Sequence, residues 1–250
     1  MTVSNEFEML FAVPLECQAC VDSVSKALAS VSEITKFNVD LQNNLVTTTG
    51  SVAPSQIVRS IQATGKDAII RGTGKPNSAA VCILESFDEK DFANPVKGLA
   101  RIVSLGDSDA VVDLTVNGLP AGTYYPSIRA SGNLSQGALS TGKLFYDLGL
   151  ILVNEPLSVE TVIKSEGAHQ KPISDSFAGQ SFLHAKLNVS ELIGRSIILS
   201  RVKDSIASDS ICGVIARSAG VWENDKQVCS CSGKTVWQER GDAKKRGVAV

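Results

Sequence analysis

Pro14-Leu15-Glu16-Cys17-Gln18-Ala19-Cys20 stands between two patterns of different period. Residues 6–13, which precede it, alternate loosely between apolar and polar side chains and end at a proline, which predicts a strand. After it, apolar side chains recur at helical spacing, at Val21, Val24, Leu28 and Val31. The sequence therefore predicts a strand, a loop that carries the first cysteine, and an amphipathic helix that begins near the second.

The residues after this helix predict the rest of a small α+β domain. Residues 34–40 and 45–49 have strand character. Pro54 suits the first turn of a second helix, and Gly65 is a suitable stop for it. Residues 67–71 then predict a last strand. The order βαββαβ is typical of a ferredoxin-like sandwich.

Cys17 and Cys20 have a spacing that lets both sulfurs converge on one ion. The N-terminus of a helix favours thiolate over thiol, and thiolates are the ligands that Cu(I) prefers. Two thiolates around Cu(I) leave one net negative charge, which Lys66 in the loop before the last strand is a candidate to offset. A lone C-x-x-C is also compatible with a redox motif or with half of a zinc site. The chain has no second C-x-x-C to complete four zinc ligands, and a thioredoxin-like fold requires a different strand order.

Residues 71–78 are short, polar and rich in helix and strand breakers, which indicates a linker. We therefore divide the chain into a first domain of residues 1–74, a middle domain of residues 75–217 and a tail of residues 218–250. Short strands separated by turns dominate the middle domain, at 79–84, 98–105, 110–116, 124–128, 142–146, 195–201 and 213–216. Many short strands of this kind predict an all-β sandwich or Greek-key barrel.

The tail contains a second cysteine pair, Val228-Cys229-Ser230-Cys231. A disulfide across one intervening residue is strained and easily reduced, so the pair suits thiol exchange, soft-metal binding or both. The alternative is that Cys229 and Cys231 are two ordinary cysteines without a function. The presence of another close pair, Cys17 and Cys20, argues against this alternative. Residues 241–250 contain three basic side chains and little to pack, which predicts disorder.

The totals exclude several classes of protein. The 250 residues carry 24 basic and 26 acidic side chains, a net charge of -2, which gives no reason to expect a nucleic acid or an anionic membrane as partner. No apolar run approaches the roughly 18 residues of a spanning helix, and the N-terminus is a poor secretory signal. We therefore expect no membrane insertion and a cytoplasmic location. Four of the six cysteines lie in two tight pairs, which in a reducing compartment indicates metal binding or redox chemistry.

The C-x-x-C at the start of the first helix of a βαββαβ unit resembles the heavy-metal-associated domain of copper chaperones and copper-transporting ATPases. This chain has Leu15 where that family commonly has Met, a residue that packs into the core and does not hold metal. The resemblance implies that Cys17 and Cys20 bind Cu(I).

The middle domain resembles Cu,Zn superoxide dismutase, through Ala80-Val81-Cys82-Ile83-Leu84, Asp113-Leu114-Thr115-Val116-Asn117-Gly118-Leu119, Leu192-Ile193-Gly194-Arg195-Ser196 and Cys212-Gly213-Val214-Ile215. The dismutase's metal ligands are missing. Histidine positions of that enzyme fall at Ser127, Arg129, Leu144 and Ser200, and its superoxide-attracting arginine falls at Asp209. The dismutase centre needs six histidines and an aspartate, and the whole chain has only His169 and His184. We therefore expect no superoxide dismutase activity.

This chain keeps the residues that match the dismutase's subunit interface, although it has lost the residues that match the metal ligands. By resemblance, the residues of that interface are Ile193, Gly194, Gly213, Val214, Ile215 and Ala216. This implies docking on a true dismutase subunit as a heterodimer, and self-pairing as a homodimer when alone. Cys82 is expected to be a packed core thiol. Cys212 matches the dismutase's disulfide cysteine, but the partner position holds Ala138, so we expect a reduced core thiol.

The run from Val221 to Arg240, with its C-x-C at Cys229 and Cys231, resembles the third domain of the copper chaperones for superoxide dismutase. All three regions thus resemble one family, in its fungal form. The resemblance implies a metallochaperone that is not an enzyme: it receives Cu(I) from a copper importer or other donor, docks on Cu,Zn superoxide dismutase, delivers the copper and promotes the target's disulfide through its tail cysteines. It also allows a fraction in the mitochondrial intermembrane space. An active dismutase with an added metal domain and a passive copper buffer are the alternatives.

Overall fold

The computed structural model describes residues 5–156, 176–228 and 231–245. The first domain contains β1 (Phe7–Ala12), α1 (Gln18–Ala29), β2 (Ile34–Asp40), β3 (Leu45–Gly50), α2 (Pro54–Gln62) and β4 (Ile69–Thr73). Its four antiparallel strands lie in the order β2-β3-β1-β4. Val24 and Leu28 of α1 and Ile57 and Ile61 of α2 share one buried core with Phe11 of β1. The predicted ferredoxin-like domain is confirmed.

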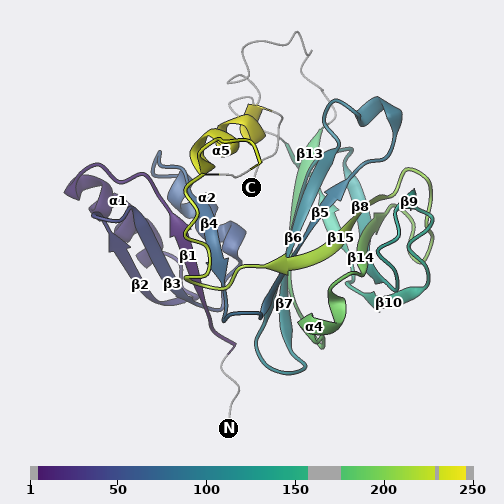
Figure 1. Ribbon diagram of the computed structural model, residues 1–250, viewed down its shortest axis with the longest axis horizontal. Helices are drawn as coiled ribbons and strands as arrows, with labels where there is room; N and C mark the ends of the chain where they lie inside the picture. Colours follow the sequence, from purple (N-terminus) through teal and green to yellow (C-terminus); the bar gives the residue numbers. More distant parts are fainter. Residues whose placement is uncertain (1–4, 157–175, 229–230, 246–250) are drawn as a thin grey trace.

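The second domain is a barrel beside the first (Figure 1). Its wall consists of β5 (Ala79–Glu85), β6 (Val96–Ser104), β7 (Ala110–Leu119), β8 (Gly122–Arg129), β11 (Ile151–Val153), β13 (Phe177–Ala185), β14 (Ser196–Ser200) and β15 (Ile211–Ser218). The order is β8-β14-β15-β5-β6-β7-β13, and β11 pairs with β8 from the other side. The N–H of Asn154, directly after β11, donates to the carbonyl of Ala178 in β13 at 3.1 Å. This contact closes the wall, and non-sequential neighbours such as β15 beside β5 give it Greek-key connections.

Smaller elements lie around the barrel: a 3-10 turn at Glu89–Asp91, β9 (Ser135–Ala138), β10 (Leu144–Asp147), β12 (Glu155–Pro156) and α4 (Val189–Leu192). The barrel interior holds Leu84, Ile102, Leu114, Ile128 and Ile197, all fully buried. Within the described ranges, no helix is long and apolar enough to cross a membrane.

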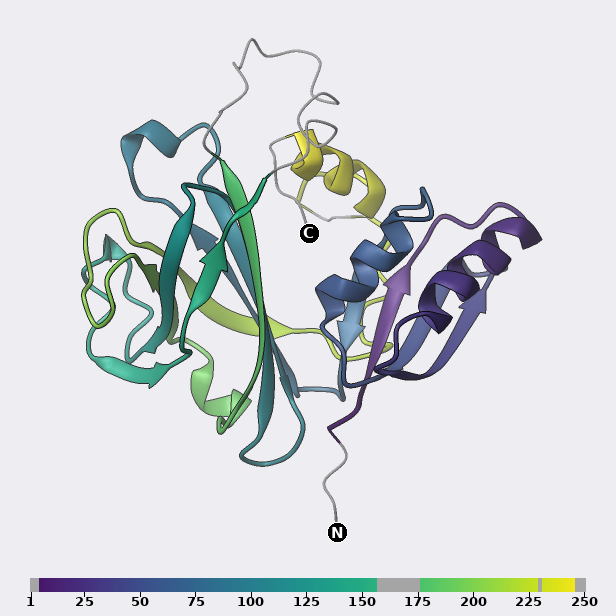
Figure 2. The same cartoon turned by 180° about the vertical axis from the view of Figure 1, so that it is seen from behind.

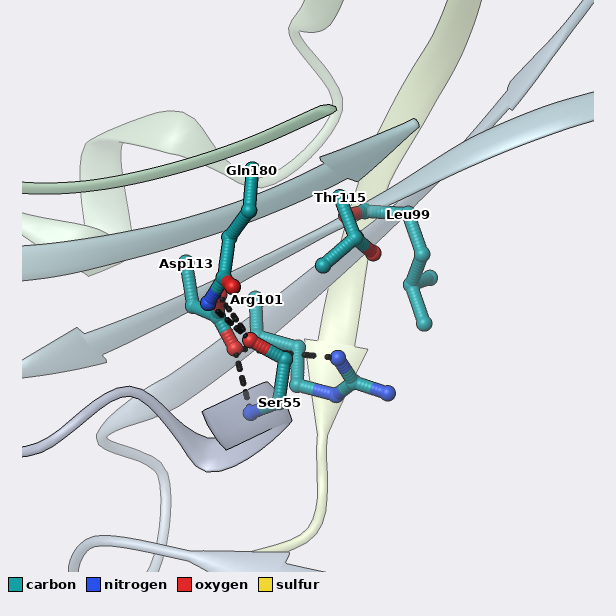
Figure 3. Close-up of polar contacts among 6 residues, drawn as sticks. All are labelled: Ser55, Leu99, Arg101, Asp113, Thr115 and Gln180. Atoms are coloured by element: carbon teal, nitrogen blue, oxygen red, sulfur yellow. Dashed lines mark hydrogen bonds and ion pairs between the residues drawn. The ribbon is translucent and has the colours of Figure 1, made fainter. Parts of the chain in front are cut away.

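A buried carboxylate joins the two domains. Asp113 of β7, 1% exposed, accepts the backbone N–H of Ser55 at 2.8 Å and the Ser55 hydroxyl at 2.7 Å (Figure 3). Gln180 of β13 donates to the Ser55 hydroxyl and, at 3.3 Å, to Asp113. The residue before α2 is Ala53, whose side chain cannot cap the helix. Asp113 therefore caps α2 from the other domain and complements the positive end of its dipole.

Three sequence predictions need correction. The last strand of the first domain begins at Ile69 and runs to Thr73, so the predicted linker is shortened to residues 74–78. The strand predicted at residues 110–116 is longer, because β7 continues to Leu119 with Gly118 at a φ of 67°. Residues 241–245, predicted to be disordered, belong to α5 (Val236–Lys245). Few apolar residues mark this helix, and contacts with distant residues hold it in place.

Candidate functional site

The C-x-x-C pair lies at the exposed tip of the loop between β1 and α1. Cys17 is the residue before the helix, in extended conformation, and Cys20 is in the first turn. Their sulfur atoms are 3.5 Å apart, and neither forms a disulfide. A metal–thiolate bond of about 2.3 Å allows two sulfurs up to roughly 4.6 Å apart to share one ion. The pair can therefore bind a soft cation without rearrangement of the backbone.

The surroundings of Cys20 favour its thiolate. A backbone hydrogen bond from Glu16 has the largest effect, followed by the bond from the Cys17 thiol, and together they lower the pKa of Cys20 from 9.0 to about 7. Lys66 contributes a smaller lowering of this pKa. Its ammonium also lies 3.9 Å from the carboxylate of Glu16. The structure thus places Lys66 beside the pair, where its charge can offset that of a copper dithiolate.

The tail returns to the first domain on both sides of its cysteine pair. Cys229 and Ser230 lie outside the described residues, and Cys231 is exposed in the turn before α5. Upstream, the side chain of Arg71 in β4 donates two hydrogen bonds, of 3.1 and 2.8 Å, to the carbonyl of Asn224. The tail here runs so close to β4 that a Cβ on Gly72 would lie 2.1 Å from the Gly220 carbonyl oxygen.

Downstream of the cysteines, α5 is held by ion pairs to a single carboxylate. Asp67 lies 3.4 Å from Nε of Arg240 and 2.6 Å from Nζ of Lys244. Burial acts to raise the pKa of Asp67, but the hydrogen bond from Lys244 and the charge of Arg240 outweigh it, so the pKa is below its ordinary value. Since Asp67 follows Lys66, which pairs with Glu16, these ion pairs anchor the tail helix on the loop between α2 and β4; Figure 2 shows α5 beside the first domain.

The positions that match dismutase ligands converge in space without any metal-binding side chain. Ser127, Arg129, Leu144 and Ser200 line one pocket at the side of the barrel. No group of three or more potential ligands from His, Cys, Asp and Glu occurs among the described residues. His184 is exposed on β13, and His169 lies outside the described residues. The four positions therefore lie together, and their own side chains do not form a set of metal ligands.

The remaining cysteines are inert by burial. Cys212 packs against Ala138 and Ile198, so an alanine methyl occupies the place of the predicted disulfide partner. Burial raises the pKa of Cys212 to about 11 and that of Cys82 to about 12. Both are free thiols, as predicted.

The two predicted docking segments are neighbours on the barrel surface. The N–H of Gly194 donates to the carbonyl of Ile215 at 2.9 Å, and Ile215 donates in turn to Arg195 at 2.8 Å. Val214 is 39% exposed and Ala216 is exposed, whereas Ile193 is half-buried. One part of the prediction needs correction: the side chain of Ile215 is buried in the barrel core, and Gly213 is buried too, so neither offers a side chain to a partner.

Ile83 extends this surface, and the sequence did not predict it. It lies on β5 with 51% of its surface exposed. A Cβ on Gly213 would lie 1.7 Å from the Ile83 carbonyl oxygen, so glycine allows the two strands to approach closely. We call the surface formed by Ile83, Ile193, Gly194, Val214 and Ala216 the docking face. It is apolar and uncharged, as the core of a protein interface requires.

Comparison with known proteins decides the family. The model of the heavy-metal-associated domain matches residues 10–67. A Superoxide dismutase 1 copper chaperone from Debaryomyces hansenii is 67% identical, over 98% of this chain and 99% of the relative. The chain belongs to the superoxide dismutase 1 copper chaperone family. The Saccharomyces cerevisiae member is 43% identical over 97% of this chain and 98% of its own, which confirms the predicted fungal resemblance.

More distant members of the chaperone family also match. The copper chaperone for superoxide dismutase of Sus scrofa is 29% identical over 92% of this chain and 88% of its own. Among solved structures, the copper(I)-loaded first domain of the human copper chaperone for SOD1 matches 28% of this chain and 97% of that chain, at 29% identity and a TM-score of 0.27. These relatives are named as chaperones and not as dismutases, in agreement with the expectation that this family member is not an enzyme.

Asp67, Arg240 and Lys244 are functional candidates of this chaperone that the sequence reasoning missed. Arg240 and Lys244 are four residues apart, so a helix places both on one face. This spacing was the available signal. Nothing local in the sequence indicates that this face forms ion pairs with Asp67, which lies more than 170 residues earlier in the chain.

We predict that Lys66→Gln slows alkylation of Cys20 by roughly two-fold at pH 7, because loss of the ammonium raises the pKa of Cys20 and leaves less thiolate. The two stronger hydrogen bonds remain, so the effect is partial. Peptide mass spectrometry after timed iodoacetamide treatment measures it. Lys36→Gln, which removes the same charge from β2, is the control. Equal Cys20 rates in both variants would show that Lys66 does not act on the thiolate.

We predict that Asp67→Asn loosens α5, because Arg240 and Lys244 lose their shared carboxylate. Two partly exposed ion pairs together contribute about 1 kcal/mol, so amide hydrogen exchange over α5 should accelerate roughly five-fold. Asp109→Asn removes the surface ion pair with Lys186 from the barrel and is the matched control. Unchanged exchange in the α5 peptides of Asp67→Asn contradicts the anchoring role.

Proposed function

We propose that this chain carries Cu(I) on Cys17 and Cys20, docks on immature Cu,Zn superoxide dismutase and transfers the ion to it. The observation that carries this proposal is a pair of free sulfurs 3.5 Å apart, on the exposed Cys17 and the half-buried Cys20, whose pKa is about 7. Such a site binds a soft ion tightly enough to sequester it. It is also open enough for an incoming thiolate to enter the coordination shell, so the ion can leave by ligand exchange.

In the proposed complex, the barrel of this chain contacts the dismutase subunit. Among the described residues, no group of three metal ligands lies at the pocket that collects the dismutase ligand positions, while the docking face has an apolar surface on β5 and β15. We propose that this face binds the dismutase subunit in a heterodimer and binds a second copy of this chain when the target is absent. The same face can serve both, because a two-fold interface uses the same patch on each subunit.

The tail cysteines pass a disulfide to the target. In the proposed step, a thiolate of the target attacks the disulfide form of Cys229 and Cys231, which releases one tail thiolate and forms a mixed disulfide. A second target thiolate then attacks the mixed disulfide and releases the other tail cysteine. The target gains a disulfide, the tail pair gains two electrons, and an external oxidant such as dioxygen must restore it. We place this exchange in the cytoplasm and in the mitochondrial intermembrane space, after a copper importer or other donor has loaded the first domain.

Copper stoichiometry tests the first step. In chains that already carry Cys229→Ser and Cys231→Ser, we expect one Cu(I) per chain after anaerobic loading and removal of excess copper. The further changes Cys17→Ser and Cys20→Ser should abolish this binding. Retention of copper by the chain that lacks all four cysteines would place the ion elsewhere and refute the proposed site.

A passive copper buffer is the second candidate, and the docking face distinguishes it. A buffer has no reason to bind apo-dismutase, whereas a delivery protein must. Pull-down of apo-dismutase by the full chain, and not by a docking-face variant, supports delivery.

A further inference from the structure

A cavity of about 260 Å³ lies where the first domain, the barrel and the tail helix meet. Its apolar walls come from α2, β4 and β5. Its polar groups belong to Thr73, Arg101, Ser218 and Arg240. The function proposed above does not use this cavity.

Arg101 enters the cavity with its charge poorly compensated. Only 11% of the side chain is exposed, and Nη1 has no hydrogen-bond partner in the described part of the chain. Its ion pair with Asp113 is long, at 3.9 Å, and that carboxylate already accepts hydrogen bonds from Ser55 and Gln180 (Figure 3). A buried N–H without a hydrogen bond is costly, so the Arg101 guanidinium, which lines the cavity, has capacity for a further acceptor.

Arg240 brings a second guanidinium to the same cavity. It lies on α5 with its Nε 3.4 Å from Asp67. Burial lowers the pKa of Arg101 to about 10 against the opposing effect of Asp113, and the positive charge of Arg240 lowers it further. Two like charges therefore act on each other across the cavity.

We propose that this cavity binds a small oxyanion, a phosphate or carboxylate group, between Arg101 and Arg240. The planar guanidinium fork matches both kinds of group and binds them in bidentate fashion. The hydroxyls of Thr73 and Ser218 are further donors within the cavity wall. Because Arg101 belongs to the barrel and Arg240 to the tail helix, the anion fastens α5 to both domains.

The test uses the full chain in a buffer without phosphate or carboxylate. Sodium phosphate, sodium succinate and sodium chloride are added at matched ionic strength, and the melting temperature is followed by fluorimetry, with binding measured by calorimetry. At ten times its dissociation constant a ligand stabilises by about 1.4 kcal/mol, which raises the melting temperature of a chain of this length by roughly 3–6 °C. We expect this rise with phosphate, succinate or both, but not with chloride; the anion that binds identifies the source.

Arg101→Gln and Arg240→Gln should each weaken oxyanion binding at least ten-fold. Arg59→Gln, which removes a half-exposed guanidinium on α2, should leave it unchanged. Arg240→Gln alters only the tail helix, so it remains informative if Arg101→Gln does not fold. The proposal is overturned if chloride gives the same rise, if no oxyanion binds at 10 mM, a concentration set by the roughly millimolar affinity of a weak site, or if Arg240→Gln binds as the wild type does.

Discussion

A chain with Cys229→Ser and Cys231→Ser should bind superoxide dismutase 1 normally and leave it inactive. The docking face lies on the barrel and contains none of the changed residues, so the affinity for the target should be unaltered. The proposed thiol exchange, which would form the target's disulfide, then has no second free cysteine pair to use. Cys82 and Cys212 are buried with raised pKa values, and Cys17 and Cys20 are the copper ligands of the proposed mechanism.

The measurement is dismutase activity in a copper-limited extract, together with the redox state of the target's cysteines. Ser232→Ala is the control, since it changes a neighbouring hydroxyl and keeps both thiols. We expect activity at the level of an extract without chaperone for the double variant and at the wild-type level for the control. Full maturation by the double variant would remove the tail from the mechanism.

Val214→Glu should weaken heterodimer formation by at least 100-fold. The Val214 side chain points outward from β15, so the barrel tolerates the change in the free chain. In the complex, the new carboxylate would be buried against an apolar surface without a partner, which costs several kcal/mol. Analytical ultracentrifugation of the variant with apo-dismutase measures the loss, and copper binding at Cys17 and Cys20 should be unaffected.

Val202→Glu is the matched control for this experiment. Val202 is 63% exposed, outside the docking face, in the segment between β14 and β15. The same substitution there adds the same charge to the barrel. Equal affinity of the two variants for the target would show that the docking face is elsewhere.

The first domain could be predicted almost completely because its patterns are local. The helical spacing of Val24 and Leu28 and the strand at residues 34–40 depend only on neighbouring residues, and both agree with the structure. The barrel was predicted less fully. β13 lacks clean alternation, and β11 is only three residues long, so neither was recognised although both are needed to close the wall.

In the candidate site too, local features were predicted and contacts between distant residues were not. The cysteine pairs were found because few residue types bind soft metals and their spacing is visible along the chain. The partners of the tail were not found, because Asp67 with Arg240 and Arg71 with Asn224 meet across more than 150 residues. Ile83 was missed for a similar reason: its exposure depends on pairing of β5 with β15.

Direct copper transfer tests the central proposal most sharply. The full chain is loaded with Cu(I) without oxygen and mixed with copper-free, zinc-loaded superoxide dismutase 1 in the presence of excess Cu(I) chelator. We predict that the target gains copper and activity while the chelator takes up little of the ion, and that Cys17→Ser with Cys20→Ser abolishes the transfer. Loss of the copper to the chelator, or equal activation by the variant without the first pair, would contradict it.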